Sequence, residues 1–173
     1  MPELLDLLKP KQRLFVAGSS NEPTALLNHL AQFELPDQLE FIQFPLAGYN
    51  SIDFTQFNAT AVLTTFFMTP SLAGADPRRL QFLPMQMRAV YDYLSSNLDV
   101  ALLQIARDRH GILRLGPNVD FAQAVLSSAR VILAELNHGI TAPAGCPRID
   151  LDQIDFLFES ERPLRQLVTP AID

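Results

Sequence analysis

Apolar residues occur along this chain in short runs, separated by stretches of helical periodicity. Five runs are rich in Val, Ile, Leu and Phe and predict strands at residues 13–17, 39–44, 61–67, 99–105 and 131–136. The last two runs are almost uninterrupted, which is typical of strands buried on both faces of a parallel sheet. We therefore expect these two runs to form central parallel strands.

Weaker patterns fill the intervals between these runs. Residues 80–83 and 154–158 predict further short strands, and residues 111–116 predict a short strand or hairpin arm. Helical spacing is found after the first strand and again at residues 84–94 and 120–128. In the first helix Asn21 suits the N-cap position and Pro23 suits the first turn, where its missing N–H costs nothing.

The alternation of strands and helices predicts an α/β fold with a mainly parallel sheet and helices on both faces. Residues 1–173 contain no internal repeat and no Gly- or Ser-rich linker, so a single domain is expected. Residues 45–60 form a long loop, which is either a functional loop or a surface excursion. The tail at residues 163–173 is expected to be loosely held.

Composition and charge exclude several classes of protein. The 173 residues include 13 Lys and Arg against 19 Asp and Glu, giving a net charge of −6 without a basic stripe, so no nucleic-acid partner is expected. No apolar run approaches the roughly 20 residues of a membrane span. Glu3 and Asp6 are unlike the start of a secretory signal, and Cys146 is the only cysteine, so a cytoplasmic location is expected.

Neither a metal nor a bound cofactor is expected. One cysteine and three widely separated histidines, His29, His110 and His138, do not match recognised zinc-ligand spacings. The turn after the first strand has only one of the three glycines of a dinucleotide fingerprint.

Three segments follow predicted strand ends and are candidates for a binding site. Because the carboxyl ends of neighbouring strands in an open α/β sheet converge on one crevice, we expect the three segments to lie near one another. The first is the turn Gly18, Ser19, Ser20, Asn21 and Glu22, which connects the first predicted strand to the first predicted helix. Backbone amides at a helix N-terminus can attract an anion. A well-capped helix start without a ligand is the alternative interpretation.

The other two candidates contain histidine or asparagine. His110 and Gly111 follow a buried strand, where a histidine could act as an acid, a base or a hydrogen-bond donor, or could simply occupy a turn with Gly111. Asn137 ends the most apolar strand, at a position where open α/β sheets place ligand crevices, although Asn-His-Gly is also an ordinary turn sequence.

Several motifs in fixed order resemble those of the acetyl-CoA hydrolase/transferase family, which includes the 4-hydroxybutyrate and butyrate:acetate CoA-transferases. They are a His-Gly pair at His110, Leu-Gly and Val-Asp pairs ending at Asp120, Glu135-x-Asn137, and Ile-Asp followed by Glu-Ser-x-Arg-Pro-Leu at residues 159–164. The resemblance also includes residues 14–23, which comprise the first strand and a Gly-containing turn ending in Glu-Pro, and residues 80–84. It therefore extends over nearly the whole chain. It implies a CoA-transferase-like domain.

The resemblance concerns only the N-terminal half of the family's enzymes. The glutamate that attacks the acyl-CoA thioester belongs to their C-terminal half, so no catalytic residue is assigned in this chain. The expected function is an N-terminal-type domain that needs a partner half, or a homo-oligomer, for CoA transfer to a small carboxylate, with coenzyme A as a substrate. The isolated chain is expected to be inactive. The alternative is a non-catalytic binding or interaction module that retains the fold.

Two local departures from the family pattern weaken the expected site. The first turn lacks a second glycine, and the Met-Pro-Arg-Thr-x-Gly stretch of the family has Ala142 in place of its arginine, which removes a bidentate cation. A small carboxylate is therefore expected to bind with millimolar affinity at best, about −4 kcal/mol. The predicted substrate-binding residues are Gly18, Ser19, Ser20, Glu22, His110, Gly111 and Asn137.

Overall fold

The computed structural model describes residues 3–96 and 98–167. Within these residues eight strands form one sheet: β1 (Arg13–Val16), β2 (Glu40–Gln43), β3 (Val62–Thr65), β4 (Leu80–Phe82), β5 (Val100–Arg107), β6 (Leu113–Leu115), β7 (Val131–Asn137) and β8 (Phe156–Ser160). The α-helices are α1 (Thr24–Leu30), α2 (Met87–Leu94) and α3 (Ala122–Leu126). Short 3₁₀ helices are η1 (Leu4–Leu7), η2 (Ser19–Asn21), η3 (Phe54–Gln56), η4 (Pro70–Leu72) and η5 (Leu151–Gln153).

The strand order is β4-β3-β2-β1-β5-β7-β8, with all of these neighbours parallel. β6 lies off this path and pairs antiparallel with the end of β5. The two apolar runs at residues 99–105 and 131–136 are β5 and β7, which pair in register from Val100↔Val131 to Ile105↔Leu136. This confirms the mainly parallel α/β sheet and the interior place of both runs.

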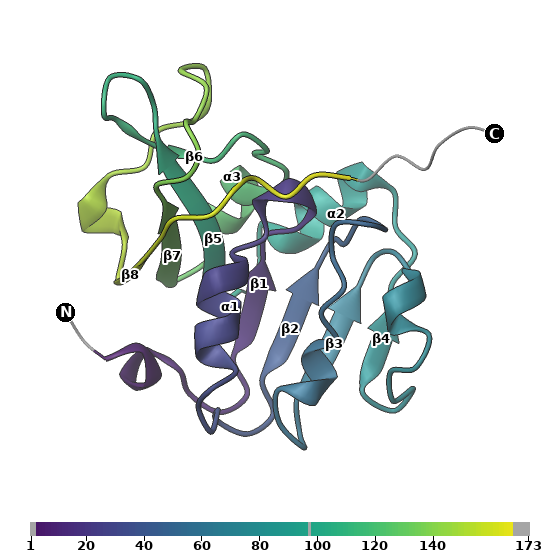
Figure 1. Cartoon of the computed structure of the whole chain (residues 1–173). Coiled ribbons are helices and arrows are strands. Elements are labelled where there is room, and N and C mark those ends of the chain that lie inside the picture. The colour runs from purple at the N-terminus through teal and green to yellow at the C-terminus, as the bar shows by residue number, and fades with distance from the viewer. Residues whose placement is uncertain (1–2, 97, 168–173) are drawn as a thin grey trace.

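Helical segments cover both faces of the sheet (Figure 1). One core cluster contains Val90 and Leu94 of α2 with Val125 of α3, and the other contains Leu26 and Leu30 of α1. The strands contribute to both clusters by alternation: in β5, Ala101, Leu103 and Ile105 face the first and Val100 and Leu102 the second. The continuous apolar sequence of β5 follows from burial on both sides.

The start of the first helix differs from the sequence prediction. The α-helix begins at Thr24 with Pro23 as its N-cap residue, whereas Asn21 lies in the preceding 3₁₀ turn η2. The buried side chain of Asn21 bonds to Gln104 of β5 instead of capping α1. Local sequence preference predicted Asn21 as the N-cap residue of this helix, but its side chain makes tertiary hydrogen bonds to β5 instead.

The described part of the tail is not loosely held, contrary to the prediction. After β8, residues 161–167, which we call the C-terminal strap, cross the sheet edge toward α2, as the yellow segment in Figure 1 shows. Arg162 and Arg165 of the strap bond to buried carboxylates. Residues 168–173 of the predicted tail lie outside the described residues.

The sheet has a topological switch point between β1 and β5. The chain passes from β1 outward through β2, β3 and β4, and then returns to β5 on the other side of β1. In open α/β sheets the crevice at the carboxyl ends of two such strands is the usual place for a ligand. The turn that contains Gly18 follows β1 and is therefore at this position.

Candidate functional site

The turn after β1 is packed tightly against the end of β2. A Cβ atom on Gly18 would lie 2.3 Å from the carbonyl oxygen of Phe44, so a side chain at this position requires a backbone shift. Ser19 has a left-handed backbone, with φ of 56°, and its amide donates to Oδ1 of Asn50 over 2.7 Å. Ser20 is half-buried beside it. The amide of Ser19 is thus already bonded within the chain.

Glu22 is a buried carboxylate, with 1% of its surface exposed. Its Oε2 accepts hydrogen bonds from Nδ2 of Asn50 (2.8 Å) and Nε2 of Gln43 (3.1 Å), and its Oε1 accepts one from Nη1 of Arg165 (2.7 Å). Burial raises the pKa of the Glu22 carboxyl, while the two amide bonds and the Arg165 cation act in the opposite direction. Glu22 therefore anchors the strap at the switch point.

Gln104 of β5 connects the turn to β7. Its Nε2 donates to Oδ1 of Asn21 (3.1 Å), and its Oε1 accepts from Nδ2 of Asn137 (3.2 Å) and from Nη2 of Arg162. Gln104 and Asn137 are fully buried. Two of the three predicted segments, the turn and Asn137, are therefore joined in one hydrogen-bond network.

Glu135 of β7 closes this network on the side of α1. Its Oε2 accepts from the backbone amides of Ala25 (2.9 Å) and Leu26 (3.1 Å), and its Oε1 accepts from Oγ of Ser160 and Nε of Arg162, both at 2.7 Å. Glu135 has no exposed side-chain surface. The carboxylate satisfies the first turn of α1 and holds the strap, a structural use of the Glu-x-Asn motif.

Sequence reasoning missed Gln104, Arg162 and Arg165, although two of them carried a signal. Gln104 is the one amide side chain in the apolar run at residues 99–105, and an uncharged polar residue there indicates a buried hydrogen bond. Arg162 belongs to the Glu-Ser-x-Arg-Pro-Leu motif. Arg165 lies just beyond that motif, and only the path of the strap places it beside Glu22.

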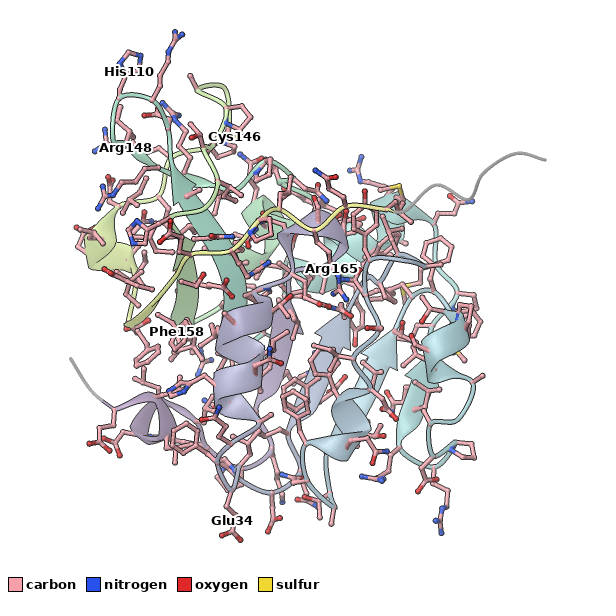
Figure 2. The ribbon with its side chains drawn as sticks, viewed as in Figure 1. Glu34, His110, Cys146, Arg148, Phe158 and Arg165 are labelled. Atoms are coloured by element: carbon pink, nitrogen blue, oxygen red, sulfur yellow. The ribbon has the colours of Figure 1, made fainter. Side chains whose placement is uncertain are left out.

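The third predicted segment, His110 and Gly111, does not join the other two. β5 pairs with β1 only as far as Val16↔Leu102 and then continues into the β6 hairpin. At about 3.3 Å per residue, this extension places the hairpin tip roughly 15 Å or more beyond the end of β1. Figure 2 shows His110 at this tip, well separated from Arg165. The expectation that all three segments share one crevice is therefore wrong.

The hairpin tip is organised by Asp108. Oδ1 of Asp108 accepts from the amides of His110 (2.8 Å) and Ile112 (3.0 Å), and its Oδ2 accepts from Nε of Arg114 (2.7 Å). These bonds lower the pKa of the Asp108 carboxyl to about 2, with Arg114 as the largest cause. Gly111 has φ of 79°, as a tight turn requires. His110 is exposed and occupies an ordinary turn position.

A hollow opens beside Ser19 at the same edge of the sheet as the polar network. Its volume is about 380 Å³, which is the size of a small-ligand site, and its walls include Phe44, Leu46, Phe67 and Met87. An adjoining hollow of 640 Å³ lies along α2, between Met87, Tyr91 and Phe121. Asn118 and Asp120 line both hollows.

Asp120 is the charged group shared by both hollows. Its backbone is left-handed, with φ of 43°, and among the described residues no hydrogen-bond partner of its carboxylate occurs. Burial raises the pKa of the Asp120 carboxyl to about 6. The sequence predicted a helix over residues 120–128 with Asp120 near its N-terminus, and in the structure Asp120 directly precedes the N-cap residue Phe121 of α3 and lines the hollows.

Within residues 3–96 and 98–167, no three His, Cys, Asp or Glu side chains gather closely enough to hold a metal ion. No helix in the same part of the chain is both long and apolar enough to span a membrane.

Comparison with known proteins identifies the family. The model of the acetyl-CoA hydrolase/transferase N-terminal domain matches residues 1–162. The chain belongs to this family. The domain is 30% identical over 76 residues to 4-hydroxybutyrate coenzyme A transferase of Clostridium kluyveri, covering 43% of this chain and 18% of that protein. It is 23% identical over an alignment of 175 positions to the succinyl-CoA:acetate/propanoyl-CoA:succinate CoA transferase of Fasciola hepatica, covering 95% of this chain and 36% of that protein.

Solved structures share the fold of this N-terminal domain. RipA from Yersinia pestis superposes with a TM-score of 0.77 at 19% identity, covering 98% of this chain and 43% of that one. The matched part thus spans less than half the length of each of these three proteins.

The departure from the family pattern at Ala142 lies away from the switch point. Ala142 is buried, and its amide donates to the carbonyl oxygen of Arg107 at the β6 hairpin over 2.9 Å. In this domain the residue at the position of the family's arginine, Ala142, therefore packs against the β5–β6 hairpin.

Proposed function

We propose that this domain forms one wall of a CoA-transferase site and acts together with a second half. The domain would supply the turn at Gly18 and Ser19 and the hollow beside it. The second half would supply the glutamate that attacks the acyl-CoA thioester, as the family resemblance implies. The observation that carries the proposal is the position of the 380 Å³ hollow, beside Ser19 at the switch point of a sheet of this family.

The lining of the hollow suits the acyl chain better than the carboxylate of a small substrate. Phe44, Leu46 and Phe67 offer apolar contacts, whereas Asp120 is the charged residue of the lining. Arg165 of the strap is the cation at the switch point that a substrate carboxylate would need, but it is already paired with Glu22. We therefore place a short acyl chain against the hollow and expect the cation for a carboxylate or for CoA phosphates to come from the second half.

The experiment compares the isolated domain with the assembly that exists in the source cells. The purified domain is incubated with butyryl-CoA and acetate, and CoA esters are followed by chromatography. No exchange is expected, because positioning groups alone do not supply the covalent step. Exchange by the isolated domain, abolished by mutating one of its own residues, would overturn the proposal.

The second measurement is the native mass of the protein isolated from source cells, followed by the same assay on that assembly. The proposal requires a second half in the assembly and CoA exchange by it. An assembly that contains a second half but exchanges no CoA would also contradict the proposal.

A non-catalytic binding module is the second candidate, and one observation favours it. The amide of Ser19, which an anion would need, is bonded to Asn50, and Glu22 adds negative charge to the turn. Titration with butyrate, followed by amide NMR shifts, tests what such a module would bind. Saturable shifts at Ser19 and Asn137 with millimolar affinity support a residual carboxylate site, and their absence leaves protein interaction as the role of such a module.

A further inference from the structure

Four large exposed apolar side chains lie around the two hollows beside α2. Leu46, Phe67, Met87 and Tyr91 border the two hollows, with 39%, 50%, 62% and 41% of their surfaces exposed. We call these four side chains the α2 patch. Met68, Phe82 and Met85 are also exposed and adjoin the patch in sequence. Contiguous apolar surface of this kind marks an interaction site on a folded protein.

Charged groups surround the apolar centre of the patch. Arg88 and Asp92 on α2 are largely exposed and pair with each other over 3.5 Å. The Asp120 carboxylate, in contrast, lines both hollows without a hydrogen-bond partner among the described residues. A partner that covers the hollows must offer a donor to Asp120, because a carboxylate closed off from water without one is costly.

The path of the chain indicates what covers this patch. The described residues end at Leu167, whose side chain packs beside Gly48. Gly48 lies two residues from Leu46 of the patch, so the strap ends next to it. The relatives of this domain have more than half of their length outside the part that it matches. A domain that follows the strap would begin at this side of the molecule.

We propose that the α2 patch is the docking surface for the second half of the enzyme, which covers it with apolar side chains and one Arg or Lys directed at Asp120. The second half is either a continuation of this polypeptide or a separate chain. This inference rests on the proposed function, since it assumes that a second half exists. It adds the surface that binds this half and the contact chemistry.

The test places a photo-crosslinking amino acid at Tyr91, in the protein expressed in source cells at its natural length. The matched control carries the same amino acid at Leu151, which is 55% exposed and lies in η5, away from the patch. Cross-linked peptides are identified by mass spectrometry. We expect Tyr91, but not Leu151, to cross-link to a sequence that matches the C-terminal half of the family.

Two substitutions test the contact chemistry in the same assembly. Where the second half is a separate chain, Tyr91→Glu is expected to weaken its association by at least tenfold, and Asp120→Asn by about three- to tenfold, while Leu151→Glu leaves it unchanged. Where the two halves form one chain, Tyr91→Glu is expected to increase protease cleavage between them, and Leu151→Glu is not. Folding of each variant is checked by circular dichroism and urea unfolding. Cross-linking of Tyr91 to a second copy or an unrelated protein, or no cross-link from Tyr91, overturns the inference, as does association insensitive to Tyr91→Glu.

The outcomes separate this inference from the proposed function. If the assembly exchanges CoA but its second half is cross-linked from Leu151 and not from Tyr91, the function holds and the docking surface is wrong. If Tyr91 cross-links to the second half and the assembly exchanges no CoA, the docking surface holds and the function is wrong.

Discussion

The buried polar network around Gln104 and the α2 patch lie at the same edge of the sheet but differ in how far the chain completes them. In the network, Glu135 and Glu22 each receive bonds from an arginine of the strap and from neighbouring amides. At the patch, Asp120 has no such bond among the described residues, and apolar side chains face solvent. A domain that satisfies its buried charges in one place, and in another leaves a half-buried carboxylate and exposed apolar side chains without partners, indicates where it meets something else.

The difference also separates structure from function within the family motifs. The Glu-x-Asn and Arg-Pro-Leu motifs meet in the network, where they hold α1 and the strap in place. Asp120 of the Val-Asp pair instead borders the hollows. We therefore expect substitutions in the network to affect stability first and substitutions at Asp120 to affect association.

The largest effect is expected for Glu135→Gln. The substitution leaves Arg162 without its counter-ion in a buried site, so the free energy of unfolding should fall by about 3 kcal/mol. Urea unfolding at pH 7 measures the loss. Glu159→Gln on β8 is the control, because its carboxylate is 67% exposed, and it should change stability by less than about 0.5 kcal/mol. Equal effects of the two substitutions would mean that the network does not stabilise the domain.

Gly18→Ala should lower the free energy of unfolding by about 2 kcal/mol, because the new Cβ meets the carbonyl oxygen of Phe44 and the turn must move. Thermal and urea unfolding both report this loss. Gly145→Ala is the control, since no atom lies within 4 Å of its Cβ position, and it should leave stability unchanged or slightly higher. A Gly18→Ala variant as stable as the control would show that the turn adapts easily.

Arg165→Met keeps an apolar stem but removes the cation from Glu22. The substitution should raise the pKa of the Glu22 carboxyl further and lower stability by about 1 kcal/mol at pH 7.5. The loss should disappear near pH 4, because the carboxyl is then protonated in the folded state and needs no cation. Urea unfolding at the two pH values measures the difference. A loss of the same size at pH 4 would assign the effect to packing of the Arg165 stem.

The last effect, of similar size, is a gain of stability, and it concerns Asp120 beside the α2 patch. The raised pKa of Asp120, about 6, means that the carboxyl stabilises the isolated domain below pH 4 and that this stability is lost as the pH rises through 6. Asp120→Asn should therefore increase stability by about 1 kcal/mol at pH 7.5, a value reduced for partial exposure, and change little at pH 4. Asn also tolerates the left-handed backbone of this position. Destabilisation at pH 7.5 would show that the Asp120 carboxylate already has a stabilising partner.

Much of the fold could be predicted from the sequence, because the spacing of apolar residues reflects which face of each helix or strand is buried. The runs that became β5 and β7 had the Val- and Ile-rich composition typical of strands buried on both faces, and the helical spacing of Leu26, Leu27 and Leu30 located α1. The turn at Gly18 and the strand end at Asn137 were also identified correctly as neighbours, because strand ends of a parallel sheet meet at one edge.

The amino-acid sequence by itself determined the order of strands and helices, since apolar periodicity is a local property of the chain. Only the tertiary structure decided which polar side chains meet. The extension of β5 into a hairpin separated His110 from the crevice, and the path of the strap brought Arg165 to Glu22 over 143 residues. Neither arrangement can be read from neighbouring residues in the sequence. Each depends on where distant backbone segments meet in the fold, and the second also depends on the need of the buried Glu22 carboxylate for a cation.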